Sequence, residues 1–390
     1  MNKRYFIFLS SFLFSILSDS LYVVATMSII YKKTNSVLLS SLSIVVAMVG
    51  YSLGCLLINK VISSLLPKSI FTYNRCIRIF LLLILLLSSS YNISIILLLT
   101  IVFLIPIFTG MDSVLEYAIL PKFGEDYTKL NSLMSLTRNI GEMSSWAIGG
   151  ILVALLGENI TFIISMLLLI LSVILIQYIY LPNIKSTKSA QDKKKLDKKS
   201  FSIILHNKIN KRVFAMDFFD LLTTGLWSSA VLLEIIIIKY NSDRITWGIS
   251  YALYLLGGII AGIIIYKWSY YFEKISSSVL IISSIIYIII ISILMSTDSI
   301  IMLFILLFIL GFPEQGKEVT QVSLLQNNNN EDEMIRVFST YNIFQTVLFS
   351  VSTVLIGYLV DEFSINFAFI FCLLLSSITL LVAFSFKLVR

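Results

Sequence analysis

The sequence predicts an all-α membrane protein with twelve transmembrane helices arranged as two six-helix bundles. Hydrophobic residues make up 58% of the 390 residues and charged residues only 13%. The mean hydropathy is +0.94, and in soluble proteins charged residues alone average about a quarter of the chain. Apolar runs of about 20 residues, the length that crosses a bilayer, recur about six times in each half. A basic polar stretch separates the two sets of runs.

The polar stretch defines the expected domains. Lysines dominate residues 185–199, where Asp192 and Asp197 are the only acidic residues and no apolar period marks a core. Two matching bundles joined by such a linker are typical of membrane transporters built from repeats. We predict an N-terminal bundle at 1–182, a cytoplasmic basic linker at 183–212 and a C-terminal bundle at 213–390.

Composition excludes several classes of function. The net charge is +7, but the positive residues lie between apolar runs and not on a folded surface, so we expect no nucleic-acid partner. The three cysteines have no paired spacing, and His206 is the single histidine, so disulfides, zinc clusters and His-based triads are not expected. Phosphate-binding glycine loops are missing. We therefore expect no enzyme, no cofactor and no metal.

The first apolar run, at 1–31, begins like a secretory signal, with Lys3 and Arg4 before it. It continues past Asp19 without a small-residue cleavage pattern, so we predict a retained helix. The later spans are expected at 37–62, 69–90, 93–118, 131–156, 160–181, 213–239, 245–269, 275–296, 299–325, 335–360 and 364–386.

Lysine and arginine set the expected orientation. If both termini are cytoplasmic, only four of the 29 Lys and Arg residues fall at outer helix ends or in outer loops, namely Lys32, Lys33, Lys239 and Arg244. The positive-inside rule therefore predicts that both termini and the linker are cytoplasmic.

Glycines indicate an internal repeat. The second expected helix of the first half carries Gly50 and Gly54, and the second helix of the other half carries Gly258 and Gly262. Both pairs are small-xxx-small stripes, which let helix backbones approach closely, and each is followed by a cation near the inner helix end. The same spacing at the same ordinal helix favours two related halves.

Three stretches carry a family likeness: Ser18 to Ser36, the segment from Ala118-Ile-Leu-Pro121 through Ser135-Leu-Thr-Arg-Asn139 to Gly149-Gly150, and Ile356-Gly357 to Asp361. Together they resemble the major facilitator superfamily, in particular its bacterial drug and macrolide efflux branch. The resemblance implies export across the bacterial cytoplasmic membrane by a working monomer. The loop between Asn59 and Lys68 departs from the family because it lacks an acidic residue and a glycine. A Gly-Pro expected before Gly149 reads Ser145-Trp146. These departures weaken the case for proton antiport more than the case for transport.

Ionisable residues inside the expected spans are the candidate functional residues. Inserting each of them at mid-bilayer costs about 2.5 to 3.5 kcal/mol of free energy, so their presence needs a reason. Asp19 lies midway along the first helix, and its neighbours Ser18 and Ser20 are expected local hydroxyl partners. A buried carboxylate of this kind suits proton coupling. The alternative is a structural hydrogen bond that packs two helices.

Two charged pairs mark the fourth and fifth expected helices. Asp112 and Glu116 are four residues apart and share one helix face, as do Arg138 and Glu142. We expect Arg138 at a depth where it pairs with Asp112 or Glu116, while Glu142 faces the cavity. Such a network either exchanges partners during transport or forms a static salt bridge.

The second half has its own candidates. Asp217 and Asp220 open the expected seventh helix, where the positive end of the helix dipole accounts for Asp217 and leaves a role for Asp220 open. In the tenth helix, Glu314 has Lys317 and Glu318 within about one turn. This spacing fits either a functional carboxylate or a local ion pair.

These patterns together predict a secondary transporter that works by alternating access, with a small amphipathic substrate, protons as coupling ion and the lipid bilayer as its surroundings. The 27 Phe and 19 Tyr residues suit a cavity for such a substrate. Exporters of a lipid, a siderophore-like compound or a peptide remain alternatives. So does a transporter-like sensor or immunity protein that no longer transports, which the departure at Asn59 to Lys68 favours.

Overall fold

The computed structural model describes residues 3–34, 37–62, 64–89, 94–124, 126–181, 204, 206–242 and 244–389. Every regular element in these ranges is a helix. The chain divides into two compact units. The first comprises Met1–Glu125, Thr137–Leu196 and Asn330–Ile343, and the second comprises Asp126–Leu136, Asp197–Asn329 and Phe344–Arg390. Most of the predicted linker, at 183–203 and 205, lies outside the described residues.

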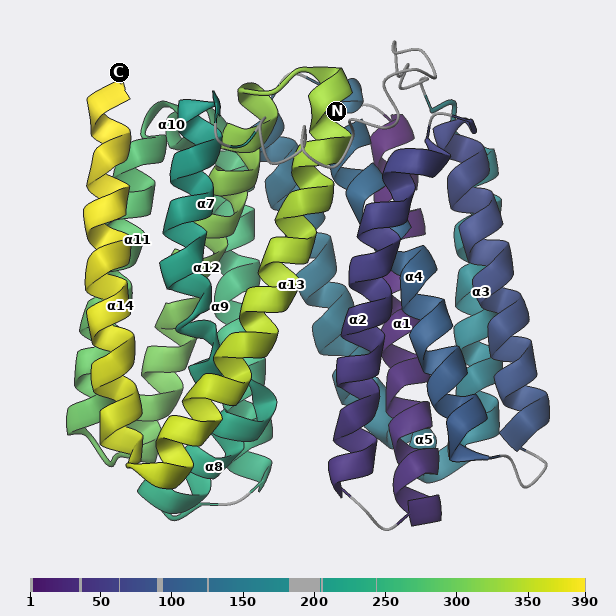
Figure 1. Cartoon of the computed structure of the whole chain (residues 1–390), viewed down its shortest axis with the longest axis horizontal. Helices are drawn as coiled ribbons and strands as arrows, with labels where there is room; N and C mark the ends of the chain where they lie inside the picture. The colour runs from purple at the N-terminus through teal and green to yellow at the C-terminus, as the bar shows by residue number, and fades with distance from the viewer. Residues whose placement is uncertain are drawn as a thin grey trace. The chain divides into compact units, whose positions relative to one another are not determined.

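Five long helices make up most of the first unit, and they run alongside one another as a bundle (Figure 1). They are α1 (Lys3–Thr34), α2 (Val37–Val61), α3 (Pro67–Ser89), α4 (Ile95–Ile119) and α5 (Tyr127–Gln177), with the short η1 (Leu120–Phe123) after α4. The first residues of α5, up to Leu136, belong to the second unit. Within α5, Gly157 has φ +81°, a left-handed conformation that glycine adopts without steric cost. The two predicted spans at 131–156 and 160–181 therefore form two helices that meet at this glycine.

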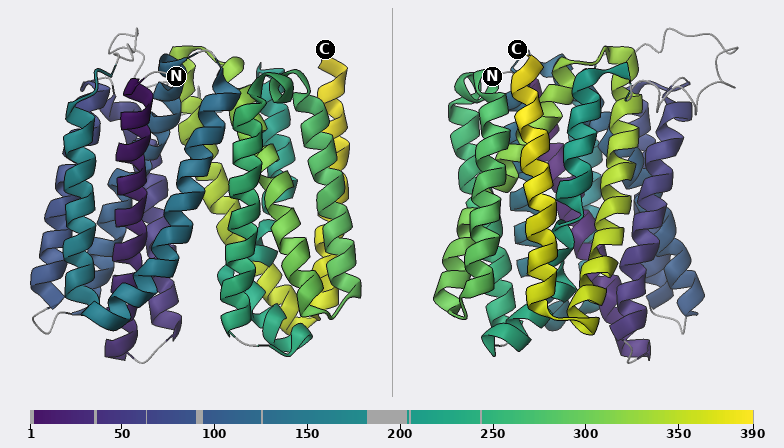
Figure 2. Two further views of the ribbon diagram at one scale, coloured as in Figure 1. Left: turned by 180° about the vertical axis from the view of Figure 1, so that it is seen from behind. Right: turned by 60° about the vertical axis from the view of Figure 1, so that its left-hand side comes forward.

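The second unit is also a bundle of helices (Figure 2). Its elements are α7 (Lys208–Leu221), η3 (Thr224–Trp227), α8 (Ser229–Tyr240), α9 (Arg244–Lys267), α10 (Ser269–Lys274), α11 (Ser276–Ser296), α12 (Ile300–Asn327), the later part of α13 (Glu331–Glu362), α14 (Ile365–Ser385) and η4 (Phe386–Val389). The side chain of Asn207 caps α7 by accepting from the backbone N–H of Ile209 and Asn210. Because of this cap, α7 begins before the predicted boundary at residue 213.

The helices account for the predicted spans. In the described part of the chain, nine are long and apolar enough to cross a membrane, and Val45–Val61 of α2 is a shorter apolar helix. The two predicted spans that remain are the first part of α5 and the interrupted segment α7–η3–α8. The expected all-α membrane fold is thus confirmed, and the protein is a multi-pass membrane protein.

The predicted continuous helix at 213–239 is wrong in one respect, since it is broken between α7 and α8. Ser352 of α13 stabilises the break, because its hydroxyl accepts from the N–H of Gly225 at 2.8 Å and donates to the carbonyl of Leu222 at 2.7 Å. The serine thereby replaces hydrogen bonds that an uninterrupted helix would supply. Gly225 also lies so close to Ser352 that an added Cβ would overlap it.

Glycines bring two pairs of helices into close contact, as the repeat predicts. In the first unit, a Cβ added at Gly54 or Gly110 would overlap the backbone of the facing helix, so α2 and α4 pack at backbone distance. In the second unit, Gly257 and Gly311 place α9 and α12 in the same relation. Of the predicted stripe, Gly258 lies at this contact, since its backbone N would be 2.4 Å from a Cβ added at Gly311, whereas a Cβ added at Gly262 would meet the side chain of Leu136 at 3.4 Å and not a facing backbone.

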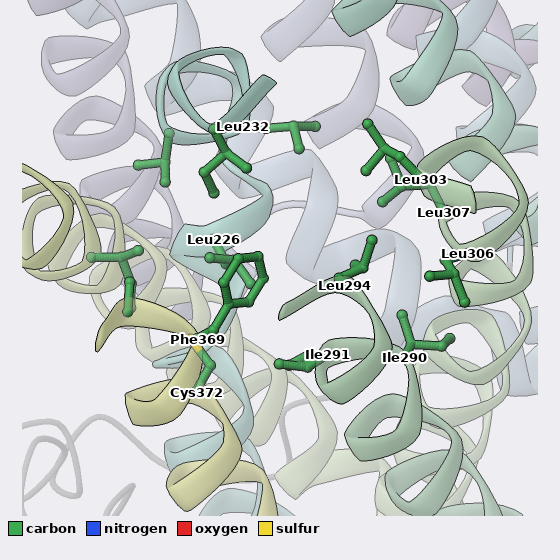
Figure 3. Close-up of a cluster of buried hydrophobic side chains, with 14 of the residues drawn as sticks. Leu226, Leu232, Ile290, Ile291, Leu294, Leu303, Leu306, Leu307, Phe369 and Cys372 are labelled. Carbon is green, nitrogen blue, oxygen red and sulfur yellow. The ribbon is translucent and has the colours of Figure 1, made fainter. Parts of the chain in front are cut away.

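Apolar side chains fill the interior of each unit and also cover its outside. Leu232, Ile291, Leu307 and Phe369 belong to one buried cluster of the second unit, built from η3, α8, α11, α12, α13 and α14 (Figure 3). Large apolar side chains are also exposed, for example Leu381 at 69%. A surface of this kind fits lipid surroundings, in which burial of apolar groups does not by itself drive helix association. Polar and charged side chains buried between the helices are therefore the groups whose role has to be examined.

Candidate functional site

Two arginines of α3 form the centre of a buried charge cluster in the first unit. Arg75 and Arg78 lie within the apolar segment Pro67–Leu87, and both side chains are 0% exposed. The spacing of three residues places them on one face of the helix. The sequence-based prediction missed them because they fall inside an otherwise apolar run. Two cations within one turn of a predicted span are themselves a signal, because such residues are costly in a bilayer.

Arg78 pairs with Asp19 of α1. One terminal nitrogen of the guanidinium contacts the Asp19 carboxylate directly, and the other donates to the hydroxyl of Ser15 at 3.1 Å. The expected local hydroxyl partner Ser18 instead hydrogen-bonds Ser165 of α5 at 2.8 Å, because it lies on the face of α1 that packs there. Asp19 is therefore held by an arginine from another helix.

Asp112 of α4 is held by three groups of α3. The side-chain amide of Asn74 donates to Asp112 Oδ1 at 2.6 Å, while Arg75 Nε and Arg78 Nη1 each lie 3.6 Å from Asp112 Oδ2. Arg75 also donates to the hydroxyl of Ser11 at 2.5 Å and to the carbonyl of Ser172 at 3.2 Å. The cluster thus ties α1, α3, α4 and α5 together through charge-assisted hydrogen bonds.

The other charged candidates of the first unit lie near this cluster. Glu116 is one turn along α4 from Asp112 and is 4% exposed. The guanidinium of Arg138 lies over the ring of Tyr117 at 5.4 Å and over that of Phe12 at 5.9 Å. Arg138 was expected to pair with Asp112 or Glu116. The two arginines of α3 contact Asp112 in its place, whereas Arg138 interacts electrostatically with Glu116. Glu142 is half-buried.

Lys317 forms the centre of a second cluster, in the second unit. Its ammonium group lies 2.8 and 2.7 Å from the two carboxylate oxygens of Asp220 and 2.8 Å from Glu314 Oε1. It also sits 4.8 Å from the centre of the Tyr287 ring. The lysine side chain is 2% exposed, whereas those of Asp220 and Glu314 are 12% and 20% exposed. The expected local ion pair of Glu314 and Lys317 is present. Lys317 also forms an ion pair with Asp220 of α7.

The helix break lies directly beside this second cluster. The hydroxyl of Tyr287 accepts from Trp227 Nε1 at 2.8 Å and hydrogen-bonds Thr223 at 2.8 Å. Asp217 and Asp220 lie in the last two turns of α7, so the predicted interaction of Asp217 with a helix N-terminus is wrong. Asp217 instead accepts from Gln321 Nε2 at 2.6 Å.

Each cluster contains one more carboxylate than cations. In the first unit, Asp19, Asp112 and Glu116 face two arginines, and in the second unit Asp220 and Glu314 face one lysine. A buried surplus negative charge is costly unless a proton or a cation compensates it. The clusters can therefore take up a proton or interact with a cationic ligand. No group of His, Cys, Asp or Glu within the described ranges is arranged to hold a metal ion.

The family model described as the Major Facilitator Superfamily matches residues 7–312. The chain belongs to this superfamily. Two Bacillus subtilis (strain 168) proteins are similar over nearly their whole length. The uncharacterized MFS-type transporter YfmI is 25% identical, over 99% of this chain and 97% of that protein. The uncharacterized MFS-type transporter YjbB is 22% identical, over 98% and 95%.

Solved structures of superfamily transporters share the fold. The human organic anion transporter MFSD10 has a TM-score of 0.80 at 10% identity, covering 97% of this chain and 98% of its own. A bacterial homologue of the iron transporter ferroportin in an outward-facing state has 0.77 at 13% identity, covering 99% and 100%. The transporter FucP has 0.77 at 12% identity, covering 98% of both chains. The protein is thus a superfamily transporter and not an enzyme.

Proposed function

We propose that this transporter exports an amphipathic cation across the bacterial cytoplasmic membrane by alternating access, in exchange for protons. The observation that carries the proposal is the surplus carboxylate in each buried charge cluster. A bilayer interior penalises isolated charge strongly, so side chains of this kind are typical of substrate and proton pathways. Both a cationic substrate and a proton would neutralise the surplus, which permits their exchange.

The environment of Lys317 supports a cationic substrate. Its ammonium group is surrounded by two carboxylates and an aromatic ring, with Tyr287 at 4.8 Å and the Glu314 side chain 20% exposed. Carboxylates beside aromatic rings are the groups that bind organic ammonium ions in proteins. A substrate amine would compete with Lys317 for the same partners. An anionic substrate would meet unfavourable charge in both clusters.

The direction of transport rests on the resemblance to the drug and macrolide efflux branch, and the orientation on the positive-inside pattern. With both termini in the cytoplasm, export moves the substrate outward while protons enter. Among the transporters of this fold, MFSD10 is described as an organic anion transporter, and the ferroportin homologue is named for an iron transporter. The fold is thus compatible with substrates of different charge, and the charges inside each unit favour a cation.

The test is uptake into sealed vesicles that contain the purified protein. Tetraphenylphosphonium serves as an amphipathic cation, and an uncharged aromatic compound of similar size is the matched control. An imposed pH gradient, acidic inside, should accumulate the cation several-fold over protein-free vesicles and leave the control compound at background. Glu314→Gln should weaken uptake, whereas Glu362→Gln, at an exposed carboxylate outside both clusters, should not.

Two results would redirect the proposal. Equal uptake of charged and uncharged compounds would favour an exporter of lipids or peptides. No uptake of any compound, by protein that is folded, would favour the sensor or immunity protein. The loop from Asn59 to Lys68, which lacks the acidic residue and glycine of the family, would then be the feature to examine.

A further inference from the structure

Glu116 differs from the other carboxylates of the first unit in having no fixed partner. It is 4% exposed, and no hydrogen bond or ion pair joins its side chain to another residue in the part of the chain that the structure describes. Asp19 and Asp112, in contrast, contact Arg78, and Asp112 also accepts a hydrogen bond from Asn74. The surplus negative charge of the cluster therefore falls on Glu116.

The charged groups around Glu116 do not remove this surplus. Four charged side chains interact with it electrostatically, namely Asp112 of its own helix, Arg75 and Arg78 of α3, and Arg138 of α5. Both α3 arginines already contact Asp112. Arg138 adds one positive charge, but it has Glu142 one turn away on α5, which adds one negative charge. Two other titratable side chains of the unit, Tyr51 and Cys55 of α2, are uncharged in their ordinary state.

We propose that Glu116 is the residue that binds the exchanged proton, while Asp19 and Asp112 stay ionised as fixed counter-ions of the α3 arginines. The proton forms an O–H bond with one carboxylate oxygen and leaves the side chain neutral, so that the buried cluster carries two positive and two negative charges. On release the proton returns to water and the carboxylate becomes anionic. This assignment rests on the proposed proton exchange for its role in transport, but protonation itself is independent of the substrate.

The position of Arg138 explains how the anionic form is accommodated. Its guanidinium stacks over the ring of Tyr117, the residue next to Glu116, and it interacts electrostatically with Glu116. Since α4 and α5 are separate helices, a change in their relative position alters this interaction. Proton release is therefore linked to helix movement, which is the coupling that an exchanger needs.

Infrared difference spectroscopy of the purified protein tests the assignment without any substrate. A pH change from neutral to alkaline should remove a carbonyl stretching band of a protonated carboxyl group from the wild-type spectrum. Glu116→Gln should lack this band, whereas Asp19→Asn and Asp112→Asn should retain it. The band present in Glu116→Gln, or absent from wild type across the pH range, would overturn the proposal.

Stability provides the second measurement and guards against misfolded variants. Replacing a neutral carboxylic acid with an amide removes no charge, so Glu116→Gln should melt at the wild-type temperature in detergent. Asp112→Asn removes a counter-ion of two arginines and should melt several degrees lower. A large loss of stability in Glu116→Gln would mean that the ionised form supports the fold, and would also overturn the proposal. If the infrared result holds but vesicles show no transport, only the proposed function fails.

Discussion

Replacing Arg78 by methionine should destabilise the first unit strongly, since the structure indicates which charge is left behind. Asp112 would keep Arg75 at 3.6 Å and the amide of Asn74 at 2.6 Å. Asp19 would lose its ion pair, and its side chain is only 21% exposed. Breaking one partner of a buried pair costs about 3–5 kcal/mol. At roughly 2–4 °C per kcal/mol for a unit of this size, the melting temperature should fall by on the order of 10 °C.

Buried cysteines provide the assay. Cys55 of α2 is buried and Cys76 of α3 is exposed, so a thiol-reactive dye labels Cys76 at once and reaches Cys55 only when the first unit unfolds. In a background with Cys76→Ser and Cys372→Ser, the labelling of Cys55 reports the melting of that unit. Adding Asp19→Leu to Arg78→Met removes the unpaired charge and should recover most of the lost stability. A melting temperature within about 2 °C of wild type for Arg78→Met, or a double variant as unstable as the summed singles, would refute the pairing.

Three further predictions concern packing and the second unit. Gly54→Ala should reduce the yield of folded protein and lower its melting temperature, because the new Cβ overlaps the backbone of Ile107, whereas Gly248→Ala, with nothing within 4 Å, should be tolerated. Ser352→Ala should lower the free energy of unfolding by about 1–3 kcal/mol, because backbone groups at the helix break lose their partner. Thr353→Ala is the control, since its hydroxyl hydrogen-bonds only its own helix, and an equal loss of stability in this variant would contradict the reasoning. In a background that keeps Cys372 and carries Cys55→Ser and Cys76→Ser, Lys317→Met should lower the temperature at which Cys372 is labelled by roughly as much as Arg78→Met lowers that for Cys55, and added Asp220→Asn should partly reverse the effect.

The membrane spans were predictable because hydropathy determines them directly. A run of about 20 apolar residues has few alternatives to a helix in a bilayer, since backbone polar groups must be satisfied within the segment. The break in the predicted span 213–239 was not predictable in the same way. It depends on Ser352, which is distant in sequence and supplies hydrogen bonds to Gly225 and Leu222.

The acidic members of the candidate clusters were also predictable, as was the local pair of Glu314 with Lys317, but the partners from other helices were not. Asp19, Asp112 and Glu314 stand out because charge is rare inside apolar runs. Identifying a partner requires the rotation of each helix about its axis, which periodicity does not give in segments that are apolar on all sides. Arg138 shows this limit, since the sequence left a pair with Asp112 or with Glu116 open. In the structure α3 supplies Arg75 and Arg78 to Asp112, and Arg138 interacts with Glu116.

The glycine repeat was predictable in part. The sequence indicated that the second helix of each half approaches another helix closely, and the structure shows the approach of α2 to α4 and of α9 to α12. In α9 the predicted Gly258 takes part in the contact together with Gly257 and Gly311, but the predicted Gly262 does not. A glycine stripe predicts a close approach but not the face that the partner helix presents.

Exchange of a cation for a proton is the central claim, and simultaneous recording of both in one vesicle preparation tests it most directly. Sealed vesicles with an internal pH-sensitive dye would receive tetraphenylphosphonium from outside. The account predicts that cation entry is accompanied by proton exit in wild type and that Glu116→Gln abolishes the proton movement while the protein stays folded. Cation entry without proton movement in wild type, or proton movement that is unchanged in Glu116→Gln, would contradict it.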